Sequence, residues 1–152
     1  MTVWATAIAT DLSATYPEAA DQIAANLDRV TAGLAEVETD LSAVGPVILP
    51  HDGYAYLQRV SGLQVAGQVT DVDNAAPGPA GLGALRDAVT GGEVACILYE
   101  VGPEPRWVAT LRDGTDVPAV PVDPLGTALE AGPNYAARLI SGLVDDIRTC
   151  AG

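Results

Sequence analysis

Residues 47–57 have the sequence VILPHDGYAYL, in which an apolar run stops at a proline and the only histidine of the chain follows. The apolar run is typical of a buried β-strand. After it, Tyr54, Leu57 and Val60 recur at helical spacing. The pattern therefore predicts that His51 lies at the carboxyl end of a buried strand, which is the edge where open α/β sheets bind their ligands.

A second stretch has the same form. Residues 120–126 read VPVDPLG, so a predicted strand delivers Asp123 to the same kind of edge, and Glu100 ends another apolar run at residues 94–99. An imidazole and a carboxylate that meet there would suit zinc, and also manganese. The residues alone favour a structural role, in which they cap the following helix and His51 is hydrogen-bonded locally. For Glu100 we favour a partner of a metal ligand over a ligand or a solvated side chain.

Composition limits the classes of protein to which the chain can belong. Its 152 residues suit one domain, and a hydrophobic content of 49% argues against disorder. The net charge of −13, from 20 acids and 7 arginines, disfavours binding to nucleic acid or to anionic membranes. No apolar run approaches the roughly 20 residues that a membrane span needs. No signal-peptide pattern opens the chain, which predicts a mature form or a cytosolic protein.

The first part of the chain is predicted to be helical. An alanine-rich region breaks at Tyr16 and Pro17, which predicts one helix to residue 14 and a long one over 17–42. Thr15 and Glu18 have the spacing of a capping box. An apolar stripe with helical spacing runs along the long helix through Ile23, Leu27, Val30, Leu34, Val37 and Leu41.

The rest of the chain alternates strands with helices. Predicted strands at residues 47–50, 62–69, 94–99 and 119–122 are separated by predicted helices that end near residues 61, 90 and 112, with a loop at 71–81 and a last helix over 134–149. This alternation predicts a three-layer α/β domain with a four-stranded parallel sheet. We expect residues 1–44 to form a helical segment and residues 45–152 to form the α/β lobe.

Two cysteines, Cys96 in a predicted strand and Cys150 at the end of the last helix, fit either two buried thiols or one disulfide. A metal role for them is disfavoured, because neither has a second cysteine or a histidine nearby in the sequence. Enzyme signatures are also missing: no G-x-S-x-G turn occurs, and no acid pair stands out. A hydrolase with a metal-bound water at His51 and Asp123 would lack a third ligand and a base. We therefore expect no enzyme.

Two segments resemble a known family. HDGYAYL at residues 51–57 and DPLG at 123–126 resemble the "HDAY-Y-F" and "DPLG" signatures of the zinc- and manganese-binding proteins of bacterial ABC importers. Their order matches the carboxyl-terminal lobe of that family, and the long helix resembles its connecting helix. The resemblance implies metal capture in a cleft between two lobes, with His51 and Asp123 as ligands, and delivery to a membrane permease from the periplasm or another extracytoplasmic space.

The resemblance also has consequences for the cysteines and for the rest of the site. Cys96 and Cys150 fall where some zinc-specific members carry a disulfide. The family's amino-terminal lobe has no counterpart, and Thr2 stands where the family has a ligand histidine. We therefore expect a truncated protein that binds zinc weakly, with its site completed by a separate amino-terminal lobe or by a second copy of the chain. The alternative is a metal-independent interaction or structural module that keeps the fold.

Overall fold

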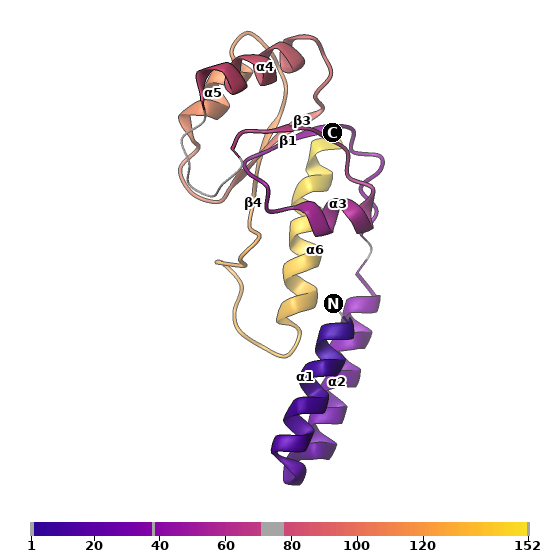
Figure 1. Ribbon diagram of the computed structural model, residues 1–152. Coiled ribbons are helices and arrows are strands. Elements are labelled where there is room, and N and C mark those ends of the chain that lie inside the picture. The colour runs from indigo at the N-terminus through magenta and orange to yellow at the C-terminus, as the bar shows by residue number, and fades with distance from the viewer. Residues whose placement is uncertain (1, 38, 71–77, 152) are drawn as a thin grey trace. The chain divides into compact units, whose positions relative to one another are not determined.

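A computed structural model describes residues 2–37, 39–70 and 78–151 (Figure 1). The chain divides into two compact units. The first unit comprises Met1–Glu38 and Leu125–Gly142, and the second comprises Thr39–Pro124 and Leu143–Gly152. Among the helices described, none has both the length and the apolar character required to cross a membrane.

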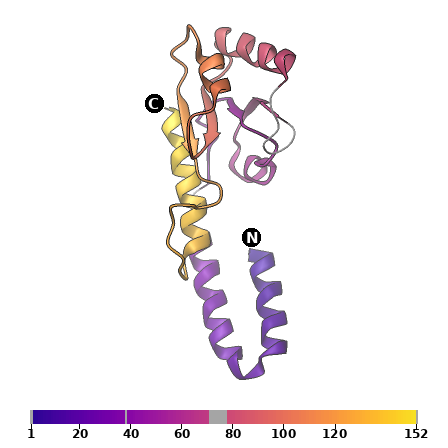
Figure 2. The same cartoon turned by 90° about the vertical axis from the view of Figure 1, so that its left-hand side faces the viewer.

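The first unit is built around a helical hairpin. Helix α1 (Thr2–Thr15) is followed by a 3-10 turn, η1 (Pro17–Ala19), and by the antiparallel helix α2 (Ala20–Ala35), as Figure 2 shows. Side chains of both helices line an apolar groove between them: Ala5, Ile8, Ala9 and Leu12 from α1, and Ile23, Asn26, Leu27 and Val30 from α2. The predicted stripe therefore packs against α1 over its first three positions.

Helix α2 ends at Ala35, well before the predicted end at residue 42. The Asp40 carboxylate accepts hydrogen bonds from the N–H and the hydroxyl of Ser42, at 2.9 and 2.7 Å. Such local bonds offer the backbone an alternative to the helix. Leu41 consequently leaves the stripe and is buried in the second unit.

The predicted capping box at the start of the second helical segment is wrong. The Thr15 hydroxyl donates to the carbonyl of Asp11, at 2.8 Å, in the preceding helix. The residue before η1 is Tyr16, which makes no side-chain cap, although Pro17 begins the turn as expected.

The second unit is an α/β sandwich, as predicted. Its four strands are parallel and lie in the order β2-β1-β3-β4. The strands are β1 (Val47–Leu49), β2 (Val65–Gln68), β3 (Cys96–Glu100) and β4 (Ala119–Val122). The helices are α3 (Ala55–Ser61), α4 (Pro79–Thr90), α5 (Arg106–Arg112), the end of α6 (Tyr135–Arg148) and the 3-10 turn η2 (Thr149–Ala151). Of the loop predicted at 71–81, residues 71–77 lie outside the described part of the chain.

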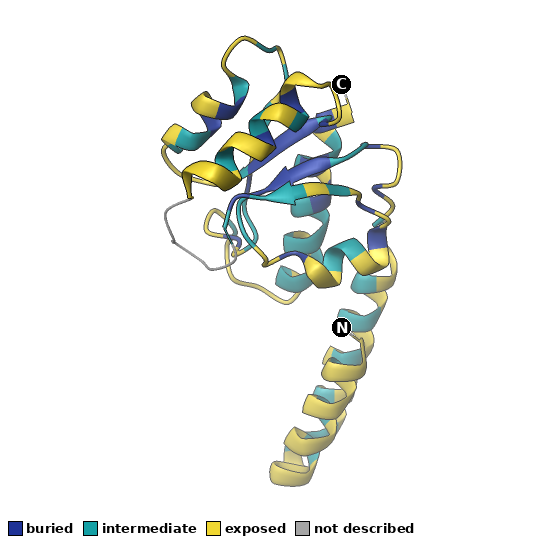
Figure 3. Cartoon of the chain, turned by 45° about the horizontal axis from the view of Figure 1, so that its top comes forward, coloured by how far each residue is buried: buried dark blue, intermediate teal, exposed yellow. Residues whose placement is uncertain are grey.

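The core lies on both faces of the two central strands, β1 and β3, most of which is coloured dark blue, as buried, in Figure 3. On one face, Ile48 of β1 pairs with Ile97 of β3 and packs in a cluster with α4 and α5. Neighbouring strand residues point to the opposite face, where Val47 pairs with Cys96. Apolar residues at the sheet centre thus hold a helical layer on each side.

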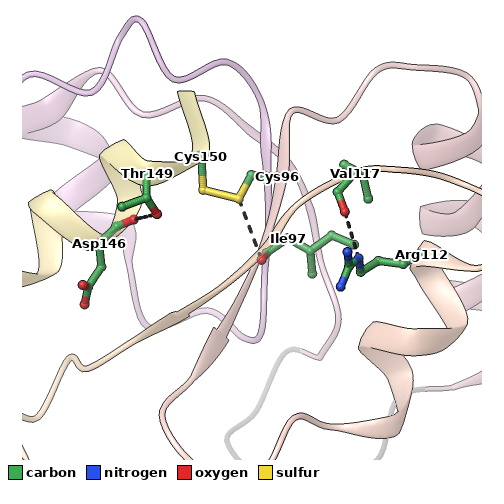
Figure 4. The surroundings of a disulfide bond; sticks show 7 residues. All are labelled: Cys96, Ile97, Arg112, Val117, Asp146, Thr149 and Cys150. Atoms are coloured by element: carbon green, nitrogen blue, oxygen red, sulfur yellow. Dashed lines mark hydrogen bonds between the residues drawn. A yellow bond between two sulfur atoms is a disulfide. The ribbon is translucent and has the colours of Figure 1, made fainter. Parts of the chain in front are cut away.

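On the second face a disulfide joins the sheet to the 3-10 turn η2. Cys96, the first residue of β3, is bonded to Cys150 in η2, and their Cα atoms are 5.5 Å apart (Figure 4). Val144 and Ile147 of α6 are also completely buried. The bond ties the central strand to the end of the last helix and confirms the disulfide that the family resemblance implied.

Candidate functional site

His51 lies in the loop between β1 and α3, where the structure agrees with its predicted place after a buried strand. Pro50 follows β1, and its carbonyl accepts a hydrogen bond from the N–H of Thr70 at 3.2 Å. This contact anchors the loop to the chain beyond β2. The His51 side chain is only 15% exposed, so its ring is held against the protein.

The His51 ring contacts a carboxylate from the neighbouring strand. Its Nε2 atom lies 2.8 Å from Oε1 of Glu100, the last residue of β3. The Glu100 side chain is 44% exposed, so the pair sits where the sheet edge opens to solvent. Because β1 and β3 are adjacent and parallel, their carboxyl ends lie at one edge. The structure therefore brings together His51 and Glu100, two of the three residues that the sequence selected for this edge.

Two further residues define where the ring lies. A Cβ atom added to Gly53 would lie 2.6 Å from Cε1 of His51, so the imidazole occupies space that only a glycine leaves open. The ring of the buried Tyr54 lies 5.7 Å from the imidazole, at an interplanar angle of 49°. Neither contact follows from the sequence, although Gly53 stands where the family signature has alanine.

Asp123 directly follows β4, as predicted. In the β3–β4 ladder Glu100 pairs with Val122, and the N–H of Val101 donates to the Val122 carbonyl at 3.0 Å. Asp123 is therefore the first residue beyond the last paired position of β4, on the strand next to Glu100. Its Oδ1 atom is buried.

A second acid lies beside Asp123 and was not identified from the sequence. The carboxylate of Asp146, in α6, accepts a hydrogen bond from the backbone N–H of Asp123. Burial raises the pKa of Asp146 above its ordinary value of 3.8; the hydrogen bond from Asp123 opposes that rise, and the charges of Asp123 and Asp145 add to it. The sequence pattern marked α6 only as a packing helix. The signal available in the sequence was an acid between Val144 and Ile147, two apolar positions of the inner face of that helix.

The donor atoms at this edge are an imidazole and carboxylates, which suit zinc and manganese. Across residues 2–37, 39–70 and 78–151, no group of three or more His, Cys, Asp or Glu side chains is arranged to hold a metal ion. Within the described part of the chain, these side chains therefore do not form a closed metal site.

Comparison with known proteins identifies the family. Over residues 1–150 the sequence matches the family described as "Zinc-uptake complex component A periplasmic". The chain belongs to this zinc-uptake family. Family members are periplasmic metal-binding components of transport systems and not enzymes, so the resemblance read from residues 51–57 and 123–126 is confirmed.

Relatives of the chain include the "High-affinity zinc uptake system protein ZnuA" of Brucella abortus (strain 2308), which is 32% identical over 149 residues. That alignment covers 94% of this chain and 45% of the relative. The protein of the same name from Haemophilus ducreyi is 26% identical, with coverages of 94% and 48%. The chain therefore spans about half the length of the curated relatives it matches.

Solved structures share the fold. A crystal structure of ZnuA superposes with a TM-score of 0.73 at 19% identity, over 97% of this chain and 55% of the other. The solute-binding protein FpvC of Pseudomonas aeruginosa, in complex with Mn2+, gives a TM-score of 0.62 at 23% identity, over 93% of this chain and 57% of the other.

Proposed function

We propose that the chain is a metal-binding lobe of an ABC-importer solute-binding protein, with zinc as the cargo and manganese as the alternative. His51 and Asp123 would supply ligands, and Glu100 would orient the His51 ring. The observation that carries the proposal is the 2.8 Å contact between His51 and Glu100 at the carboxyl edge of the sheet. Metal-binding histidines commonly use one ring nitrogen for the metal and the other for a carboxylate.

The donor set predicts modest affinity. Zinc in a structural site takes four ligands, whereas His51 and Asp123 would give two. Water, a second copy of this chain, or a separate amino-terminal lobe would complete the coordination. An incomplete site suits a metal that is transported, because ligands contributed by two separate bodies can move apart and release the ion.

Membership of the family supports a proposal for the partner and the compartment. The cargo would pass to an ABC permease from the periplasm or another extracytoplasmic space. The Cys96–Cys150 disulfide supports this placement, since disulfides persist in oxidising compartments.

Calorimetric titration with zinc tests the proposal. We expect the parent chain to bind, and His51→Ala and Asp123→Ala each to abolish the heat of binding. Asp116→Ala is the matched control, because it removes a carboxylate from an exposed loop position. Binding that survives both site substitutions would refute the assignment.

A metal-independent interaction module is the second candidate, and α1 favours it. Val3, Trp4 and Ile8 are 78%, 77% and 56% exposed, and Asp11 is the only charged residue of α1. Although the net charge of the chain is −13, a second copy would meet little repulsion at a surface that carries a single charge. A parent chain that binds no zinc but forms a dimer in sedimentation, which Trp4→Ala dissociates, would favour this function.

A further inference from the structure

Asp146 lies near the end of α6, where three features fix its backbone. The Thr149 hydroxyl donates to the Asp146 carbonyl at 2.6 Å, and Cys150, four residues on, is held by the disulfide (Figure 4). The neighbouring Ile147 is fully buried. The helix end that carries Asp146 is therefore anchored to the sheet independently of the side chain of Asp146.

The Asp146 carboxylate in turn holds the chain where β4 ends. The β3–β4 ladder reaches Val122, whose carbonyl accepts the N–H of Val101. The next N–H of the strand, that of Asp123, donates to Asp146. The backbone on both sides of the Val122–Asp123 peptide is thus fixed, by β3 on one side and by α6 on the other.

We infer that Asp146 is a positioning residue for metal capture, which holds the backbone of Asp123 so that its carboxylate is presented at the carboxyl edge of the sheet. The inference rests on the proposed function and adds a residue to it. Preorganised ligands bind metal more tightly, and loss of an outer partner typically costs tenfold to hundredfold in affinity.

A purely structural role would give a different pattern. If Asp146 only fastened α6 to the sheet, its substitution would change stability and leave zinc affinity unchanged in the folded protein. The test therefore needs a readout of the Asp123 backbone and a readout of metal binding. Variants must also separate the hydrogen bond from the charge.

Three variants of the full chain make this separation. Asp146→Ala removes both the acceptor and the charge, and Asp146→Asn keeps an acceptor oxygen but removes the charge. Asp145→Ala is the matched control, because it removes one charge from the preceding, exposed position of the same helix, where Asp145 pairs with Arg148. For each we would measure hydrogen exchange of the Asp123 amide by NMR and zinc affinity by calorimetry.

We expect Asp146→Ala to lose protection of the Asp123 amide and to weaken zinc binding about tenfold to hundredfold. Asp146→Asn should keep the protected amide and most of the affinity, and Asp145→Ala should match the parent. If Asp146→Ala does not fold, Asp146→Glu replaces it. That variant keeps the charge but displaces the carboxylate by one methylene, so affinity should still fall.

Unchanged zinc affinity in folded Asp146→Ala would overturn the inference and leave the proposed function standing. A parent chain that binds no zinc would instead contradict the proposed function. In that case hydrogen exchange still tests the hydrogen bond between Asp123 and Asp146. An Asp123 amide that stays protected in Asp146→Ala would show that Asp146 does not hold it.

Discussion

At the scale of single residues, Glu100 links the sheet to the histidine. Its carboxylate is 2.8 Å from His51 Nε2. Glu100→Gln keeps the shape of the side chain but removes the charge that makes it a strong acceptor, so we expect zinc affinity to fall about tenfold to hundredfold. Because the side chain is 44% exposed, stability should change little. Glu93→Gln removes the charge of an exposed acid three residues before β3, and it should match the parent in the same zinc titration. Equal affinities for all three proteins would contradict the role of Glu100.

Gly53 sets the position of the His51 ring by having no side chain. A Cβ at this residue would lie 2.6 Å from Cε1 and 3.0 Å from Nδ1 of the imidazole. In Gly53→Ala the ring, as the end of a flexible side chain, is expected to turn away, and the contact with Glu100 should break at a cost to stability below about 1 kcal/mol. The ring ¹⁵N chemical shifts report the change. Shifts identical to those of the parent chain would show that the ring had not moved.

At the scale of elements, the turn after α2 depends on the ionised form of Asp40. The hydrogen bond from the Ser42 hydroxyl, followed by that from the Ser42 N–H, lowers the pKa of Asp40 below its ordinary value of 3.8. A lowered pKa in the folded chain means that this contribution to stability is present above pH 3.8 and is lost as the pH falls through the pKa of the folded state.

An NMR titration of the Asp40 carboxyl carbon checks this sign. We expect its midpoint below 3.8 in the parent chain and a shift back toward that value in Ser42→Ala, which removes the hydroxyl donor. Asp40→Ala should be less stable than the parent at neutral pH, and the difference should shrink in acid. A difference that grew as the pH fell would mean that the turn is held in another way.

The disulfide joins two elements that are distant in sequence. Cys96 begins β3, and Cys150 lies 54 residues later in η2. On the chain-entropy account, a closed loop of this length stabilises the fold by about 4 kcal/mol. We expect the double variant Cys96→Ala, Cys150→Ala to lose about that much in urea denaturation. Reduction of the parent chain with dithiothreitol should give a loss of similar size, and a loss below about 1 kcal/mol would contradict the entropic account.

At the scale of the whole molecule, the sequence predicted the sheet better than it predicted the contacts at its edge. Apolar runs such as 47–49, which lies between Pro46 and Pro50, predict buried parallel strands because they are short, continuous and bounded by turn residues. The predicted end of α2 is wrong for two reasons. Leu41 continues the apolar spacing although it is buried elsewhere, and the hydrogen bonds of Asp40 that compete with the helix leave no trace in the apolar pattern. Asp146 was missed because its partner, Asp123, lies on a different element and meets it only through the fold.

The net charge of −13 makes any metal titration ambiguous unless screening is separated from binding. Divalent cations weaken the self-repulsion of an acidic chain wherever they collect, and so raise its melting temperature without a site. Zinc held by His51 and Asp123 should add a gain that depends on those residues. At a free zinc concentration ten times the dissociation constant, linkage gives about 1.4 kcal/mol.

Thermal unfolding of the parent chain and of His51→Ala, each with zinc or with magnesium at equal concentration and ionic strength, resolves the two effects. Magnesium prefers oxygen ligands and keeps its water, so it should raise both melting temperatures by the same amount. Zinc should raise the melting temperature of the parent chain further. It should raise the melting temperature of His51→Ala no more than magnesium does. If zinc stabilised both proteins equally, the acidic surface alone would account for the effect, and His51 would have no part in holding the metal.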